Sequence, residues 1–208
     1  MSGERVSGFP LFPLQIVVLP SELVPLHIFE ERYKAMVADC LDSESEFGIV
    51  WLADDGLHEV GCACRIEQVL ERFEDGRLNL VARGTRPLRI LERQRDLAYP
   101  AGVVEFLADA SEPPATALLE TAREAYAELV RKATDRSPSA EELASLGAYA
   151  MAATVDFGLE AKQCLLELRS ERSRLDLVAR LFRAALKRLD FVDLAQARAR
   201  SNGKVRFG

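Results

Sequence analysis

The hydrophobic pattern of the 208-residue chain changes once along its length. In the first half, short runs rich in β-branched and aromatic residues alternate with turns and acidic loops, as at residues 14–18, 47–52 and 102–106. Runs of this length and composition predict strands. Beyond residue 111, apolar residues recur at three- and four-residue spacing, which predicts helices. The pattern therefore predicts an α+β protein in which the strands come first.

The clearest predicted strand pair is a long β-hairpin over residues 60–84. Apolar residues alternate in both of its strands, and Asp75-Gly76 between them supplies the turn, where φ is positive. The alternating positions are Val60, Cys62, Cys64 and Ile66 in the first strand, then Leu78, Leu80 and Ala82 in the second.

One helix is predicted among the strands, over residues 29–41, because apolar residues recur there at helical spacing. The segment before it carries four prolines. Pro10 and Pro13 predict an extended approach in which sheet pairing begins only at Leu14. Pro20 and Pro25 predict a loop that ends the first strand and turns the chain toward the helix.

About four helices are predicted after residue 111, and Ser139 with Glu142 forms a capping-box pair at the start of the second. Their apolar stripes need one another for burial, which predicts a helical bundle. The expected organisation is a strand domain over residues 1–110, a helical bundle over residues 111–195 and a flexible tail over residues 196–208.

The composition of the chain bears on its cellular compartment and on the charge of its first half. The chain is 49% hydrophobic and 29% charged, and its longest apolar runs fall far short of the ~20 residues that span a bilayer. It shows no secretion signal, so we expect a cytoplasmic protein with reduced cysteines and no contact with membranes. Residues 1–110 hold 11 Lys and Arg against 19 Asp and Glu, which argues against a phosphate-binding surface there.

The opening segment, residues 9–33, reads "FPLFPLQIVVLPSELVPLHIFEERY" and resembles the start of the LON domain, the substrate-recognition domain of ATP-dependent Lon proteases. Residues 60–90, "VGCACRIEQVLERFEDGRLNLVARGTRPLRI", look like the central hairpin of that family. The segments "EAKQCLLEL" and "RLDLVARL" are similar to its helical part, so the resemblance runs from residue 9 to about residue 189. It implies a PUA-like mixed β-barrel with an inserted helix, followed by a C-terminal helical bundle.

Catalytic and metal chemistry find little support. These 208 residues contain no G-x-x-x-x-G-K-[ST] phosphate loop and no recognisable Ser-Lys protease module, so we predict a protein that is not an enzyme and needs no cofactor. His27 beside Glu30 is either a general base or a packed corner residue, and we favour packing. His58, Cys62 and Cys64 share a strand face that can be a zinc site or a core face; we favour the core.

Five arginines cluster after the hairpin, and PUA-like barrels elsewhere can bind RNA, so an RNA-binding protein is the alternative function. They are Arg83, Arg86, Arg89, Arg93 and Arg95. The segment lacks interleaved aromatic residues for base stacking, and the surrounding domain is acidic. A solvated strand face paired with carboxylates is the favoured interpretation, and we expect no nucleic-acid partner.

We therefore predict a non-catalytic module that binds unfolded polypeptide or a protein partner, as the resemblance to Lon implies. Apolar residues in a proline-bounded loop are either tucked over the sheet or offered to a partner, and we favour tucking. The partner interpretation places the binding site at the corner between the first strand and the helix. The candidate binding residues there are Leu23, Val24, His27, Phe29 and Tyr33.

Overall fold

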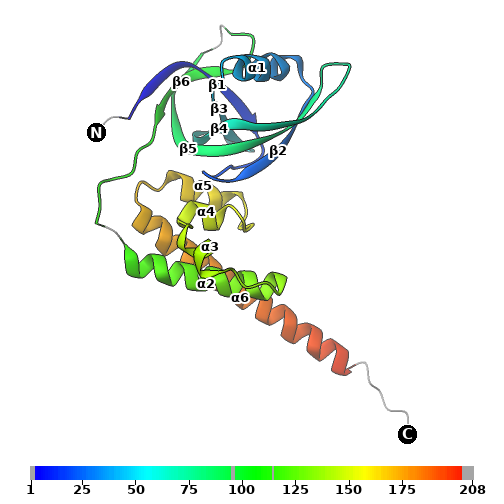
Figure 1. The fold of residues 1–208 in the computed structure, drawn as a ribbon, viewed down its shortest axis with the longest axis vertical. Helices are drawn as coiled ribbons and strands as arrows, with labels where there is room; N and C mark the ends of the chain where they lie inside the picture. Colours follow the sequence, from blue (N-terminus) through cyan, green and yellow to red (C-terminus); the bar gives the residue numbers. More distant parts are fainter. Residues whose placement is uncertain (1–2, 95–96, 114, 203–208) are drawn as a thin grey trace. The chain divides into compact units, whose positions relative to one another are not determined.

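The computed structural model describes residues 3–94, 97–113 and 115–202. Within them the chain forms a mixed sheet and a set of helices (Figure 1). The strands are β1 (Arg5–Leu14), β2 (Leu23–Ile28), β3 (Phe47–Ala53), β4 (Gly56–Arg72), β5 (Leu78–Gln94) and β6 (Ala101–Phe106). The helices are α1 (Glu31–Asp42), α2 (Thr116–Thr134), α3 (Ala140–Ala144), α4 (Ala148–Ala152), α5 (Leu159–Glu167) and α6 (Glu171–Asn202).

The chain divides into two compact units. The strand unit comprises residues 1–112 and 152–171, and the helical unit comprises residues 113–151 and 172–208. The sequence prediction grouped residues 152–171 with the helices that follow the sheet. They join the strands instead because α5 packs on β4, where the Gln163 amide donates to the Val60 carbonyl at 3.1 Å.

The strand pairings form a closed ring with one strand outside it. The sheet order is β2-β5-β4-β3-β1-β6, and β5 also pairs with β6. The β1–β3 pair is parallel and the other pairs are antiparallel. The ring closes because β5 is 17 residues long. Its first part pairs with β2 and its last part pairs with β6, so β2 remains at a margin of the sheet.

The first strand begins earlier than the sequence predicted. β1 pairs with β6 from Arg5 to Pro10 and with β3 from Leu11 to Leu14, so the predicted start of pairing at Leu14 is wrong. Each strand residue directs its backbone N–H toward one neighbouring strand only. Proline lacks this N–H, so a strand tolerates it at a position where the neighbouring strand does not need the donor. Residues 15–18, predicted as part of a strand, have no strand structure.

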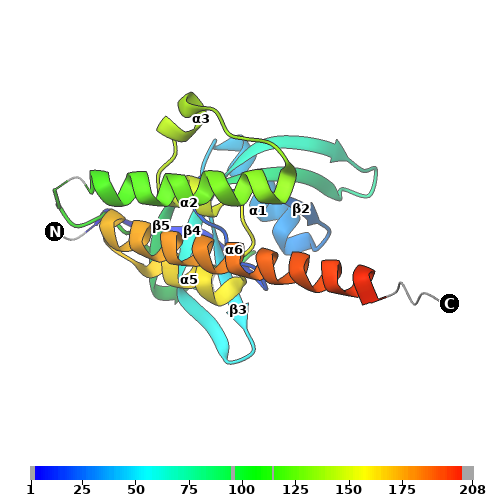
Figure 2. The same cartoon turned by 90° about the horizontal axis from the view of Figure 1, so that it is seen from below.

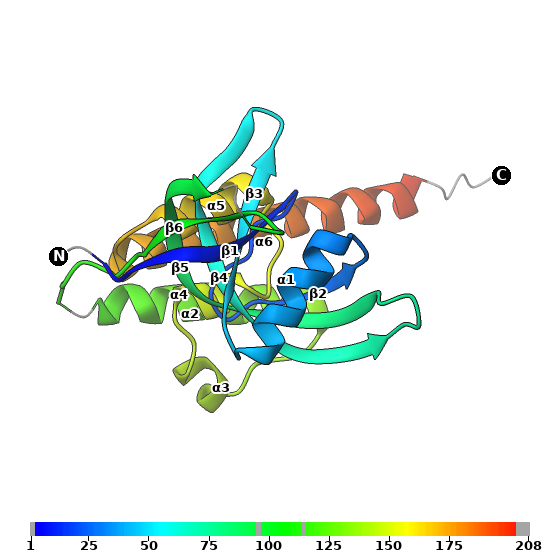
Figure 3. The same cartoon turned by 90° about the horizontal axis from the view of Figure 1, so that it is seen from above.

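The predicted hairpin and the predicted first helix are both confirmed. β4 and β5 are joined by a tight turn in which Gly76 has φ 80°. Helix α1 lies at one end of the curled sheet and α5 at the other (Figures 1 and 3). Tyr33 of α1 is buried, and its ring lies 4.2 Å from that of Phe12, measured between centroids.

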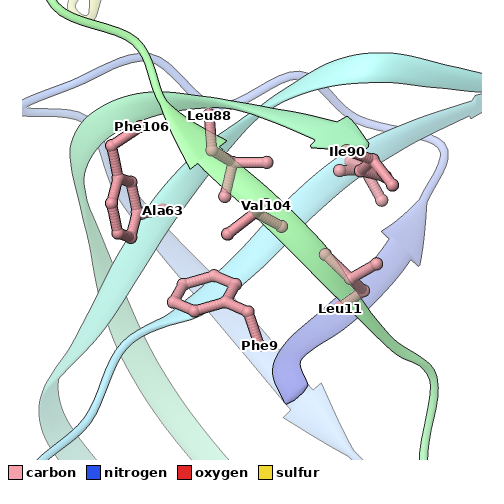
Figure 4. Close-up of a cluster of buried hydrophobic side chains, with 8 residues drawn as sticks. Phe9, Leu11, Ala63, Leu88, Ile90, Val104 and Phe106 are labelled. Atoms are coloured by element: carbon pink, nitrogen blue, oxygen red, sulfur yellow. The ribbon is translucent and has the colours of Figure 1, made fainter. Parts of the chain in front are cut away.

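The core of the strand unit lies between strands of the ring (Figure 4). Phe9 and Phe106 meet edge to face with ring centroids 5.5 Å apart. The cluster contains Phe9, Leu11, Val50, Ala63, Leu88, Ile90, Val104 and Phe106. Each large apolar side chain buried in this way contributes about 1.5–3 kcal/mol, so this cluster holds the ring together.

In the helical unit, α2 and α6 lie side by side and run in the same direction (Figure 2). Tyr126 packs on Phe182 at 5.5 Å between ring centroids, and Lys132 further along α2 pairs with Asp190. The predicted capping box at Ser139 and Glu142 is confirmed. The predicted flexible tail is helical as far as Asn202, and residues 203–208 lie outside the described residues.

Candidate functional site

The segment that contains the predicted binding residues is a strand at the margin of the sheet. Residues 20–25 were predicted to form a loop, but β2 starts at Leu23 and pairs with β5 along its whole length. Pro25 lies within this strand opposite Val81. Proline is compatible with a marginal strand because its missing N–H can face away from the neighbouring strand. The sequence prediction therefore mistook an edge strand for a loop.

The backbone of β2 leaves one edge without a partner strand in the described part of the chain. The Glu22 carbonyl accepts a hydrogen bond from Gly84 N at 2.9 Å, which fixes the phase of the β2–β5 ladder. Ladder bonds in an antiparallel pair recur at every second residue. Leu23, Pro25 and His27 therefore direct their backbone groups away from β5, and this row forms the free edge of β2.

The side chains of β2 alternate between two faces of the sheet. Leu23 is 52% exposed, and His27 is exposed on the same face. Phe29, which follows the strand, is 60% exposed and stacks on His27 with ring centroids 5.9 Å apart. Val24 points to the opposite face and is half-buried. The structure thus brings three of the predicted residues together on one surface.

Tyr33, the fifth predicted residue, lies in the core instead. Its side chain is buried against Phe12, and burial raises the pKa of its phenol, with a smaller opposing effect of the Arg32 guanidinium. Tyr33 lies in the first turn of α1, four residues after Phe29, on the side of the helix that faces the sheet. Tyr33 therefore supports α1 and is not exposed with Leu23, His27 and Phe29.

A shallow hollow of about 530 Å³ lies beside the exposed face of β2. Its lining includes Pro25, His27 and Asn79, together with Leu70, which is 55% exposed. Strand alternation in β4 contains a signal that sequence reasoning missed, because Leu70 is an apolar residue among the exposed polar positions 67, 68, 71 and 72. The hollow offers an apolar surface next to the free edge.

A hydrogen-bonded chain orients His27 in this hollow. Asn79 Nδ2 donates to Glu71 Oε2 at 2.9 Å, so Asn79 Oδ1 faces the imidazole and lies 2.6 Å from His27 Nδ1. This arrangement places the proton of the neutral ring on Nδ1. Glu30 pairs with Arg32 at 2.7 Å instead of orienting His27. His27 is therefore not a base oriented by Glu30, and its exposure also rules out the packed corner that we favoured.

The start of β2 is fixed by a tight turn over residues 19–22. Ser21 N donates to the Gly84 carbonyl at 2.8 Å, and Glu22 Oε2 accepts from Leu19 N at 2.9 Å. Glu22 Oε1 also accepts from Lys162 Nζ of α5 at 2.5 Å. Both side chains are largely buried, since Glu22 is 15% exposed and Lys162 is 14% exposed. Helix α5 therefore helps to set where the free edge begins.

Two of the arginines after the hairpin, Arg83 and Arg86, pair with carboxylates, as the favoured interpretation predicted for the group. Arg83 donates to Glu67 at 3.1 Å, and this contact is the main reason why the pKa of the Glu67 carboxyl is lowered. Arg86 bonds both Glu4 and Glu46 and lies over the ring of Phe106. Arg95 lies outside the described residues. These contacts give no support to an RNA-binding face.

Cys62 and Cys64 lie on a core face of β4. Cys62 and Cys64 are fully buried, and burial raises the pKa of the Cys62 thiol well above its usual value. His58 stacks on Trp51 with ring centroids 4.4 Å apart. Among the described residues, no group of three or more His, Cys, Asp or Glu side chains is placed to hold a metal ion.

This burial predicts the reactivity of the thiols. In the native protein we expect Cys164 to react fast with a thiol reagent, because it is exposed, whereas Cys40, Cys62 and Cys64 are buried and protected. The thionitrobenzoate released from the reagent should therefore correspond to one fast-reacting thiol per native chain and to four thiols per denatured chain. Fast native labelling of Cys62 or Cys64, located by peptide mass spectrometry, would contradict the described packing.

No helix in the described ranges is both long enough and apolar enough to cross a membrane.

Comparison with known proteins defines the family. The family described as the ATP-dependent protease La (LON) substrate-binding domain matches residues 8–183. The chain belongs to this family, as the opening segment and the hairpin predicted. A curated relative, the Lon protease of Anaeromyxobacter dehalogenans (strain 2CP-C), is 29% identical over 89% of this chain. The match spans 24% of that relative, so the chain corresponds to about a quarter of its length.

Solved structures show the same fold. The crystal structure of a Lon N-terminal domain protein from Xanthomonas campestris is 27% identical, with a TM-score of 0.60, and the match covers 82% of this chain and 96% of that one. The N-terminal domain of the Mycobacterium avium complex Lon protease is 20% identical, with a TM-score of 0.65, and covers 86% of this chain and 98% of that one. The second likeness concerns the fold alone.

Proposed function

We propose that the chain is a non-catalytic recognition module that binds exposed segments of polypeptide along the free edge of β2. One observation carries the proposal: the free edge lies beside exposed apolar side chains, Leu23 in β2 and Phe29 just after it, and beside a hollow that the exposed Leu70 lines. Such an arrangement provides backbone pairing for affinity and side-chain contacts for selectivity. Membership of the LON substrate-binding family supports the same function.

The chemistry of the edge sets limits on the bound segment. Leu23 and His27 each offer an outward N–H and C=O, whereas Pro25 between them offers only its carbonyl. A bound strand can therefore make main-chain bonds on both sides of Pro25 but not a continuous ladder. This interruption also protects the edge from pairing with copies of itself. We infer weak, reversible binding of extended chains, which suits recognition of many different segments.

The proposed function has an architecture and a cellular setting. We infer that the closed ring of strands is a PUA-like barrel and that the helices of the helical unit form a bundle. We further propose a cytoplasmic protein that acts on unfolded polypeptide or a protein partner, without a cofactor. Catalysis is not part of the proposed function.

Leu23→Ser tests the edge. We expect about fivefold to tenfold weaker binding of a reduced, carboxymethylated test protein, because the apolar contact beside the edge is lost. The thermal midpoint should change by no more than about 1 °C, since an exposed side chain contributes little to folding. Binding can be followed by fluorescence anisotropy of the labelled test protein, and unfolding by circular dichroism.

Leu52→Ser is the matched control, because Leu52 is also a strand leucine and is 42% exposed, but it lies in β3 rather than β2. It should leave binding unchanged. Equal weakening by both substitutions, or no weakening by Leu23→Ser, would remove the β2 edge as the binding site. Absence of any binding by the unsubstituted protein would contradict the proposed function itself.

A further inference from the structure

A second hollow in the strand unit has a different chemistry. It encloses about 420 Å³ and shares no lining residue with the hollow beside β2. Its floor is part of the core, since Leu11 and Ala101 are each only 2% exposed. Leu57 and Leu97 also line it. The polar side chains at its wall include two guanidinium groups, those of Arg32 and Arg93.

Arg32 is held in place from two sides. Its Nε atom donates to Glu30 Oε2 at 2.9 Å, its Nη2 atom lies 2.7 Å from the same oxygen, and its Cζ atom lies 4.6 Å from the centroid of the Tyr33 ring. A guanidinium has five N–H donors, so Arg32 keeps donors for a further acceptor. The stacked, paired guanidinium is therefore preorganised for an oxygen ligand.

Arg93 differs from two of the arginines that precede it on β5. Arg83 and Arg86 are paired with carboxylates, whereas no carboxylate in the described ranges pairs with Arg93. Its side chain is exposed at the end of β5, opposite Gly102 of β6. The Arg93 guanidinium thus stands without a carboxylate partner beside an apolar hollow. It attracts an anionic group to this position.

The walls of the hollow are fixed by hydrogen bonds. Leu11 N donates to the Pro100 carbonyl at 2.8 Å, which joins the segment before β6 to β1. Gln94 Oε1 accepts from Gly8 N at 2.8 Å, and the Tyr99 hydroxyl donates to Asp39 at 2.9 Å. Because both sides are tied down, the apolar floor keeps its shape without a ligand.

We propose that this hollow binds the C-terminal carboxylate of a polypeptide whose last side chain is apolar. The inference rests on the proposed function, since it names a class of polypeptide. Arg32 and Arg93 would receive the carboxylate, and Leu11, Leu57 and Leu97 would contact the last side chain. A polypeptide chain end carries a carboxylate and an apolar side chain on one Cα atom, which matches guanidinium groups beside an apolar floor. Its volume is at the lower end of known ligand sites and suits one or two residues.

The test compares peptides that differ only at their ends. A peptide with an N-terminal fluorophore and the end Leu-Leu is prepared as the free acid and as the amide. We expect the amide to bind about tenfold more weakly in fluorescence polarisation, because charge-assisted hydrogen bonds to the carboxylate are lost. Arg93→Gln should weaken the acid to the level of the amide and leave the amide unchanged.

Arg89→Gln is the matched control, because Arg89 is also an exposed arginine of β5 but does not line the hollow. It should leave both peptides unchanged. Equal binding of acid and amide would overturn the carboxylate site while leaving polypeptide binding at β2 intact. An amide peptide with an internal Asp that binds as tightly as the acid would overturn the assignment to a chain end. Equal weakening by Arg89→Gln and Arg93→Gln would reduce the effect to general charge attraction.

Discussion

Glu22→Ala is expected to lower the free energy of unfolding of the strand unit by about 3 kcal/mol. The substitution leaves the ammonium group of Lys162, 14% exposed, without its carboxylate partner, and removes the acceptor of Leu19 N. Removing one partner of a buried pair is costly because the other charge stays in a poorly solvated site. Trp51, the only tryptophan of the chain, lies in the strand unit, so its fluorescence in urea reports this transition.

Two further variants separate the ion pair from general damage. The double substitution Glu22→Ala with Lys162→Met should be less destabilised than the sum of the two single ones, since it leaves no unpaired buried charge. Arg77→Ala breaks the pair with Asp75, which is exposed on both sides, and should cost no more than about 0.5 kcal/mol. A loss below about 1 kcal/mol for Glu22→Ala would show that α5 does not hold the turn over residues 19–22.

Gly84→Ala is the second substitution with a large expected effect, a loss of about 2–3 kcal/mol. A Cβ atom at residue 84 would lie 2.2 Å from the Leu19 carbonyl oxygen, a contact between backbone-anchored atoms that no side-chain rotation relieves. The turn over residues 19–22 would have to move off β5. For a chain of this length the thermal midpoint should fall by about 4–12 °C, measured by circular dichroism.

Gly8→Ala distinguishes this clash from the usual cost of replacing glycine. Gly8 has φ 70°, but a Cβ atom there meets nothing within 4 Å. Its replacement should cost only about 1 kcal/mol of backbone strain. Comparable losses for Gly8→Ala and Gly84→Ala would mean that the turn yields easily. In that case the start of β2 would not be fixed by its contact with Gly84.

Local chemistry was sufficient to predict the elements that depend on neighbouring residues. Asp75-Gly76 specifies the hairpin turn, because a positive φ at this point is a property of the dipeptide and its flanking alternation. The capping box at Ser139 likewise needs only residues within one helical turn. The apolar spacing of α1 showed which face is buried, and the quoted motifs were sufficient to recognise the family.

The prolines show where local chemistry was insufficient. Pro25 breaks a strand in general but is compatible with an edge strand, and nothing in residues 20–25 says that β2 pairs with β5 on one side only. Strand order depends on pairing between distant segments. The same limitation explains why β1 was predicted to start at Leu14 rather than at Arg5.

For the candidate site, too, the sequence indicated one part and the tertiary structure decided the rest. The sequence alone directed attention to the segment that forms β2, because family motifs and apolar residues coincide there. Only the tertiary structure decided that Leu23 and Phe29 are exposed while Tyr33 is buried, since exposure depends on what packs against each face. It also joined Glu22 to Lys162 across 140 residues of chain. Such a contact leaves no local pattern, because each partner's surroundings come from elements that are distant in sequence.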